Sequence, residues 1–188
     1  MTTGSVSPRR ADTRRNNERI IAAAKDSLTC SGEVSYNAIA KKAEVGVGTV
    51  YRHFPTPESL ILAVYQREVR NLVEVVPDLL KDNPPDQAFR QWMWHLAGYL
   101  MTKRGLASAM QAARTSPEDL PAKSFTSILD ALTTMLDANV AAGTIRPGLE
   151  PLTVMRAFGG LMFLDPDGDW EDATHQLFDL LWQGMRAT

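Results

Sequence analysis

The chain contains 188 residues, of which 44% are hydrophobic and 22% charged, and its formal net charge is -2. This composition is ordinary for a folded globular protein and excludes a disordered or collagen-like chain. No apolar run approaches the length of a membrane-spanning helix, and no signal-peptide stretch follows the N-terminal arginines, so we predict a cytoplasmic protein. The single cysteine, Cys30, lacks a disulfide partner and zinc-ligand neighbours and is predicted to be a small apolar residue.

The charge is unevenly distributed. Residues 1–54 contain nine Lys or Arg and five Asp or Glu, a net charge of +4, which leaves -6 for the rest of a chain whose total is -2. A basic N-terminal module on an acidic body is typical of a phosphate-binding head joined to a sensing or dimerising body. A solvated basic face would show the same distribution, so charge alone does not decide between them.

The N-terminal region begins with residues 1–13, which lack periodicity and are predicted to form a flexible basic arm. Apolar residues then recur at Ile20, Ala24 and Leu28 with charged residues between them, the spacing of an amphipathic helix. Gly32 follows where a C-cap glycine belongs.

Two further short helices are predicted before Phe54. Ser35 lies at the N-cap position of one, and Gly46 and Gly48 bracket a tight connection to the next, residues 49–54. These helices make residues 14–56 a candidate three-helix DNA-binding domain.

The remainder, residues 57–188, is also predicted to be helical. Thr56 and Pro57 are an N-cap and a first helical residue, and they begin a long helix that ends near Pro77. Apolar periodicity predicts further helices over residues 89–101, 106–113, 125–142, 151–164 and 170–185. No segment alternates like a strand, so the prediction is an all-α fold of about nine helices.

Two short helices joined by about three residues are the arrangement of a helix-turn-helix motif. The amides of the helix after Ser35 would face a phosphate. Val47, Gly48 and Thr49 begin the recognition helix, where small residues let the backbone approach base edges. The groups that follow can hydrogen-bond phosphates or, less often, bases: Tyr51, Arg52 and His53.

Residues 19–65 resemble the N-terminal domain of the TetR repressors, on the runs RIIAAAKDSL and SYNAIAKKAEVGVGTVYRHFPTPESLILAVY. The C-terminal part resembles that family only in the number and order of helices. The resemblance implies contacts to the DNA backbone from Ser35, Tyr36, Thr49, Tyr51 and His53. It implies that Val47, Gly48 and Arg52 lie at or near base edges, and that further phosphate contacts come from Lys42, Arg9, Arg10 and Arg14. Many relatives have Lys where this chain has Pro57, so one phosphate contact is missing unless Thr56 or the helix amides replace it.

The resemblance also implies a homodimer with a C-terminal domain for ligand sensing and dimerisation, and no cofactor. The expected function is a repressor released from a palindromic operator by a small apolar or aromatic effector. The last helix independently carries a stripe of large apolar groups that needs a partner, either a second copy in a four-helix bundle or its own domain. The predicted interface residues are Leu152, Met155, Phe158, Gly159, Leu177, Phe178, Leu181, Trp182 and Met185.

Aromatic and methionine side chains suit an apolar effector pocket, although most of them would equally suit a core. The predicted pocket residues are Trp92, Trp94, His95, Tyr99, Met110, Met135 and Met162. The fourth helix joins the head to this region, so a ligand that tilts it would change the separation of the two recognition helices.

Two other functions remain as alternatives. A regulator controlled by a protein partner without a small-molecule ligand is the nearer one. A metal-assisted hydrolase is the distant one, because Asp165, Asp167 and Asp169 superficially resemble a calcium loop. Gly168 and Gln176 do not fit the required positions, and no catalytic motif is present, so we predict neither a metal site nor an enzyme.

Overall fold

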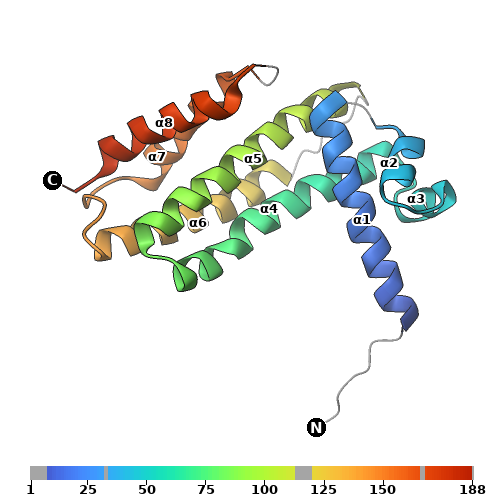
Figure 1. Ribbon diagram of the computed structural model, residues 1–188, viewed down its shortest axis with the longest axis horizontal. Helices are drawn as coiled ribbons and strands as arrows, with labels where there is room; N and C mark the ends of the chain where they lie inside the picture. Colours follow the sequence, from blue (N-terminus) through green and yellow to red (C-terminus); the bar gives the residue numbers. More distant parts are fainter. Residues whose placement is uncertain (1–7, 32–33, 113–119, 166–167, 188) are drawn as a thin grey trace, which may run out of the picture. The chain divides into compact units, whose positions relative to one another are not determined.

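The computed structural model describes residues 8–31, 34–112, 120–165 and 168–187 (Figure 1). These residues form eight α-helices and one short 3-10 helix, and they contain no strand. The helices are α1 (Pro8–Ser31), α2 (Tyr36–Lys42), α3 (Val47–His53), α4 (Pro57–Asp82), α5 (Pro85–Ala112), α6 (Leu120–Ala141), α7 (Pro151–Phe158), η1 (Gly159–Phe163) and α8 (Trp170–Met185). The all-α prediction is confirmed.

The chain divides into two compact units, one of Met1–Arg67 with Arg104–Ser116 and one of Glu68–Lys103 with Pro117–Thr188. The division falls within α4 and α5, whereas the sequence predicted a boundary after residue 56. The difference arises because the first turns of α4 carry apolar side chains of the N-terminal core: Leu60, Ile61 and Val64.

The core of the N-terminal unit joins its helices around large buried aliphatic side chains. Ile20 and Leu28 of α1, Ile39 of α2 and Val50 of α3 are each at most 1% exposed. Helix α1 begins at Pro8, so the last residues of the predicted arm belong to a helix. Proline is tolerated there because the first helical N–H has no partner within the helix.

The predicted helix starts are confirmed by their caps. The Ser35 hydroxyl accepts a hydrogen bond from the Ala38 amide at 3.4 Å. At the start of α4, the Thr56 hydroxyl accepts from the Ser59 amide at 3.2 Å, and the Ser59 hydroxyl accepts from the Thr56 amide at 3.3 Å. This reciprocal pair satisfies amides that the helix itself leaves unbonded. The predicted cap at Gly32 lies outside the described residues.

Two boundaries in the C-terminal part differ from the sequence prediction. Residues 89–101 and 106–113 were expected to form separate helices, but α5 runs continuously through both. No proline separates them, and Gly105 within a helix costs only about 1 kcal/mol relative to alanine. The helix expected over residues 151–164 ends at Phe158 and continues as the tighter η1.

The C-terminal unit is built around an aromatic core. Phe89 lies between three rings, with centroid distances of 6.3 Å to Trp92, 6.5 Å to Phe158 and 6.2 Å to Trp182. The Trp92 indole N–H donates to the Leu72 carbonyl at 2.9 Å, so this fully buried polar group is satisfied. These contacts join α4, α5, α7 and α8. In the described part of the chain, no helix is long and apolar enough to cross a membrane.

Candidate nucleic-acid interface

Helix α3 turns one face toward the interior and the other toward solvent. Val50 is fully buried, whereas Val47 is 40% and Tyr51 55% exposed. A side chain added at Gly48 would meet no atom within 4 Å, so the backbone lies open there. The outer face of α3 therefore presents bare backbone, an aliphatic group and a phenol to the outside.

Arg52 lies on this outer face and is held against the start of α3. Its Nε donates to the Gly48 carbonyl at 3.2 Å, and its Nη2 donates to the Thr49 hydroxyl at 3.2 Å. Both bonds are exposed and span a single turn of the helix. The guanidinium thus stands beside the open backbone, with remaining N–H groups directed to solvent.

Tyr36 does not lie on the exposed face that the resemblance implied for it. It is only 8% exposed, and its hydroxyl donates to the Phe54 carbonyl at 2.7 Å. Burial raises the pKa of its phenol, with smaller contributions from Tyr51 and Glu58. Its ring lies 4.5 Å from that of Tyr51. The predicted DNA contact of Tyr36 is therefore corrected, because a hydroxyl engaged inside the core supports Tyr51 instead.

The turn between α2 and α3 sets the direction of α3. The Ala43 amide donates to the Ile39 carbonyl at 2.8 Å, and the Val45 amide donates to the Ala40 carbonyl at 3.0 Å. Glu44 adopts the left-handed conformation with φ of 51°, which residues other than glycine and asparagine seldom adopt. Its carboxylate pairs with Arg19 of α1, so the strained residue is also tied to the neighbouring helix.

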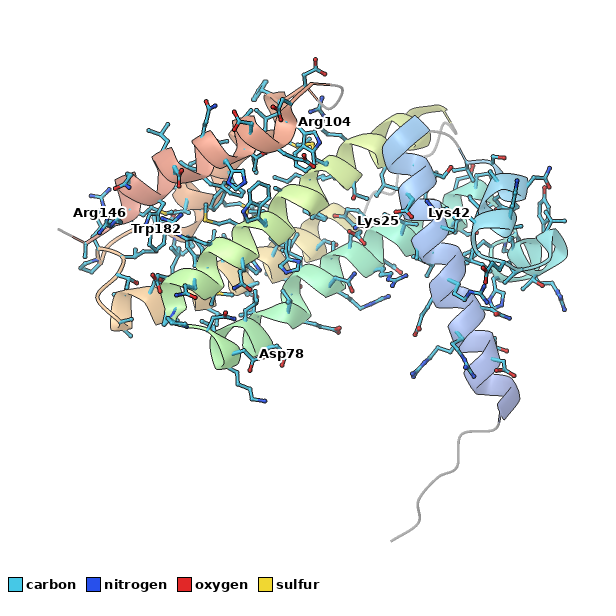
Figure 2. The ribbon with its side chains drawn as sticks, viewed as in Figure 1. Lys25, Lys42, Asp78, Arg104, Arg146 and Trp182 are labelled. Atoms are coloured by element: carbon cyan, nitrogen blue, oxygen red, sulfur yellow. The ribbon has the colours of Figure 1, made fainter. Side chains whose placement is uncertain are left out.

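Two of the other predicted phosphate contacts, Lys42 and Arg14, are exposed and paired with carboxylates. Lys42 of α2, labelled in Figure 2, pairs with Asp26 at 2.8 Å, and Arg14 lies 3.5 Å from Glu18. Exposed pairs of this kind contribute at most about 1 kcal/mol, so a phosphate can replace the carboxylate. Ser35 is exposed and His53 is half-buried. The side chains of Arg9 and Arg10 lie outside the described residues.

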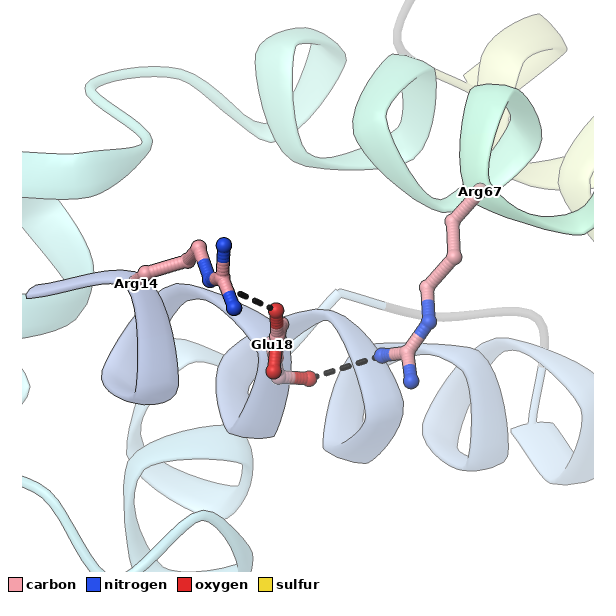
Figure 3. A network of polar contacts seen from close by, with 3 residues as sticks. All are labelled: Arg14, Glu18 and Arg67. Atoms are coloured by element: carbon pink, nitrogen blue, oxygen red, sulfur yellow. Dashed lines mark hydrogen bonds and ion pairs between the residues drawn. The ribbon is translucent and has the colours of Figure 1, made fainter. Parts of the chain in front are cut away.

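Arg67 is a structural residue of this unit that the sequence pattern did not indicate. Its Nη1 donates to the main-chain carbonyl of Glu18 at 2.8 Å, while the Glu18 carboxylate pairs with Arg14 (Figure 3). The bond ties α4 to α1. No local pattern could have revealed it, because 49 positions separate the two residues.

The predicted effector residues differ in how far they are buried. Trp92, Tyr99 and Met135 are buried in the core. Trp94 is half-buried and packs 4.3 Å from the ring of His175, while His95 and Met162 are exposed. Met110 lies outside the described side chains. Packing against α8 and within the core accounts for these contacts, so the assignment of these residues to an effector pocket stays a prediction.

A surface cavity of about 320 Å³ lies between α4 and α6. None of the described residues that the sequence predicted for the pocket lines this cavity. The lining residues come from α4 and α6 and are Val73, Val76, Pro77, Ser127, Asp130, Ala131 and Thr134.

The predicted interface residues separate into two groups. Four of them are buried within their own unit: Phe158, Phe178, Trp182 and Met185. This burial fits the alternative in which the apolar stripe packs onto its own domain. The remaining five are half-buried: Leu152, Met155, Gly159, Leu177 and Leu181.

Two exposed apolar residues were missed by the sequence prediction. Phe163 of η1 is 91% exposed and Leu180 of α8 is 69% exposed. A Cβ atom added at Gly160 would lie 3.5 Å from the Leu177 side chain, so η1 and α8 approach closely there.

The described residues offer no metal site, because no three His, Cys, Asp or Glu side chains gather among them. Asp169 instead caps α8, accepting from the Asp172 amide at 3.3 Å. Asp167 lies outside the described residues. An exposed recognition helix on a compact helical unit, joined to a second helical unit, defines a helix-turn-helix DNA-binding regulator.

Two family comparisons support this class. Residues 20–64 match the family described as bacterial regulatory proteins, tetR family, and residues 84–187 match the C-terminal domain of SbtR-like transcriptional regulators. The chain belongs to the TetR family of transcriptional regulators. Membership confirms the predicted resemblance and the prediction of a regulator rather than an enzyme.

Solved structures and a curated relative agree. A TetR transcriptional regulator from Streptomyces coelicolor is 36% identical with a TM-score of 0.85, and the match covers 92% of this chain and 99% of that one. A TetR regulatory protein from Mycobacterium vanbaalenii is 28% identical with a TM-score of 0.80, over 96% and 100% of the two chains. An HTH-type transcriptional regulator from Staphylococcus aureus is 32% identical over 78 residues, which span 40% of this chain and 41% of that protein.

Proposed function

We propose that this TetR-family chain is a homodimeric repressor that binds a palindromic operator and releases it when a small molecule binds the C-terminal unit. Such a protein would act in the cytoplasm, where its operator lies. The observation that carries the DNA-binding part is the outer face of α3, on which Arg52 stands beside the open backbone of Gly48.

In this proposal Arg52 reads base edges. A guanidinium in the major groove bonds the two acceptors of guanine, a contact worth about 1–3 kcal/mol against other bases. Val47 and Gly48 would allow the close approach, and Thr49 already orients the guanidinium through its hydroxyl. Tyr51, with its ring supported by Tyr36, would place its phenol at a phosphate.

The phosphate contacts would surround this base-reading face. Ser35, Lys42, His53 and Arg14, with the arm residues Arg9 and Arg10, would bind the backbone and fix the register of the helix in the groove. At Pro57 no lysine is available, and the amides of Thr56 and Ser59 already donate within the cap, so the usual phosphate contact would be missing at this position.

A second copy of the chain would supply the other head. The exposed Phe163 and Leu180, together with half-buried Leu177 and Leu181, form an apolar surface on η1 and α8 that a partner could cover. Two heads held in this way would meet half-sites about 34 Å apart on one side of the duplex.

Release requires that an effector bind two arrangements of the protein with different affinity. Helix α4 supplies residues to both compact units, so a ligand that contacts α4 can influence the head through one continuous helix.

Selection of duplexes from a random pool by the full chain at physiological salt tests the proposal. Enrichment of one palindrome is the expected result. Arg52→Ala should weaken binding to that palindrome by about 1–3 kcal/mol in each of the two half-sites, while binding to random DNA changes little. Arg70→Ala, which removes an exposed arginine of α4 outside this face, is the matched control and should keep full specificity. Failure to enrich any duplex would refute the proposal.

A further inference from the structure

The cavity between α4 and α6 combines an apolar wall with polar groups of Ser127, Asp130 and Thr134. Val73, Val76 and Pro77 of α4 face Ala131 of α6 across a volume of about 320 Å³. That volume is within the range of small-molecule sites, which begin at about 300 Å³. All the lining residues belong to the C-terminal unit.

Pro77 leaves a hydrogen-bond acceptor at the cavity. It lies inside α4, where the residue four positions earlier normally accepts a bond from its amide. Proline has no N–H, so it cannot donate to the carbonyl of Val73. Both residues line the cavity, so the interrupted hydrogen bond lies in the part of α4 that borders it.

The opposite wall adds a carboxylate and a second acceptor. Among the described residues that line the cavity, Asp130 is the one with an acidic side chain. The Thr134 hydroxyl donates its proton to the main-chain carbonyl of Asp130 at 3.0 Å, so toward a ligand it offers lone pairs. The cavity is therefore matched to a ligand that donates hydrogen bonds and carries positive charge.

We propose that this cavity is the effector site and that the effector is a small organic cation, an ammonium or amidinium group attached to an apolar chain or ring. The charged head would bind the carboxylate of Asp130 and the carbonyl of Val73, and the apolar part would cover Val76, Pro77 and Ala131. The regulatory role of this site rests on the proposed function. In this proposal the effector binds the cavity between α4 and α6 and not the aromatic residues named in the sequence analysis.

The position of the cavity on α4 gives the ligand a route to the head. A proline interrupts the hydrogen-bond ladder of a helix and is the usual place for it to bend. A cation that bonds the carbonyl opposite Pro77 would favour one bend over another. Helix α4 continues from this point to Pro57, and its first turns form part of the N-terminal core.

Calorimetric titration of the full chain with n-hexylammonium chloride tests the site, with 1-hexanol and sodium hexanoate as probes of equal chain length. We expect the ammonium to bind at least tenfold more tightly than either. Asp130→Asn should weaken ammonium binding at least tenfold, and Thr134→Leu should weaken it by filling the cavity. Asp137→Asn removes an exposed carboxylate from the same helix outside the cavity and should leave binding unchanged. Circular dichroism of each variant checks that it is folded.

Equal binding of the three probes, or equal effects of Asp130→Asn and Asp137→Asn, would overturn the assignment of the site. Operator retention is measured separately on the same proteins. Ammonium binding that leaves operator affinity unchanged would overturn the role as effector. Failure of the wild-type chain to bind any DNA would refute the proposed function. The titrations would still show whether the cavity binds the ammonium ion.

Discussion

The two compact units expose different chemistry, although both are helical and both bury large apolar cores. In the N-terminal unit the exposed face of α3 carries Tyr51, Arg52 and open backbone. In the C-terminal unit, η1 and α8 expose Phe163 and Leu180. Polar groups around open backbone suit a hydrated, charged partner such as DNA, whereas exposed apolar groups suit a second protein surface. The following predictions separate these roles, from the largest expected effect to the smallest.

Trp92→Ala should destabilise the C-terminal unit most. Trp92 is fully buried beside Phe89, and its indole N–H bonds Leu72, so the substitution opens a cavity and frees a buried carbonyl. We expect a loss of about 3–5 kcal/mol in the free energy of unfolding, measured by urea denaturation. Trp94→Ala is the control and should cost clearly less, because Trp94 is only half-buried.

The paired substitution Phe163→Ser with Leu180→Ser should weaken dimerisation without unfolding the protomer. Covering a large apolar side chain contributes about 1.5–3 kcal/mol, so the dimer dissociation constant should rise more than tenfold. Analytical ultracentrifugation measures it. Phe125→Ser is the control, since it exposes 45% of its surface on α6 instead. An unchanged dimer would remove η1 and α8 from the interface.

The two neighbouring tyrosines, Tyr36 and Tyr51, should respond differently to loss of the hydroxyl. Tyr36→Phe leaves the buried Phe54 carbonyl without its 2.7 Å donor and should cost about 1–2 kcal/mol of stability. Tyr51→Phe, at an exposed position, should leave stability unchanged and weaken operator binding. Equal stability losses in the two variants would contradict the placement of Tyr36 in the core.

Tyr36 also makes stability depend on alkaline pH. Burial raises the pKa of its phenol above the ordinary 10.0, so above that pH the unfolded chain loses the proton before the folded chain does. Stability is therefore complete below about pH 10 and falls as the pH rises through the folded pKa. Thermal melts should show a smaller alkaline fall in Tyr36→Phe than in wild type.

Arg67→Ala should have the smallest effect. It removes one exposed hydrogen bond to the Glu18 carbonyl, which we expect to contribute less than about 1 kcal/mol. Hydrogen exchange should nevertheless report faster opening of α1 near Glu18. Arg14→Ala, which removes only the ion pair with the Glu18 side chain, should leave that carbonyl bonded and α1 less affected.

The sequence by itself determined the helical class, the caps at Ser35 and Thr56, and the identity of α3 as the recognition helix. Helix periodicity and capping depend on residues within a few positions of one another, so local pattern suffices to predict them. The long continuous α5 was missed because glycine and polar residues at 102–105 resemble a break, although they do not enforce one.

Only the tertiary structure decided which apolar side chains face the core. Phe178 and Trp182 point inward while Leu180 of the same helix points outward, because packing against Phe89 and Phe158 selects one face of α8. The bond from Arg67 to Glu18 and the cavity of α4 and α6 likewise depend on residues far apart in the chain. Contacts of this kind follow from how helices pack, and a one-dimensional pattern of polar and apolar residues does not contain that information.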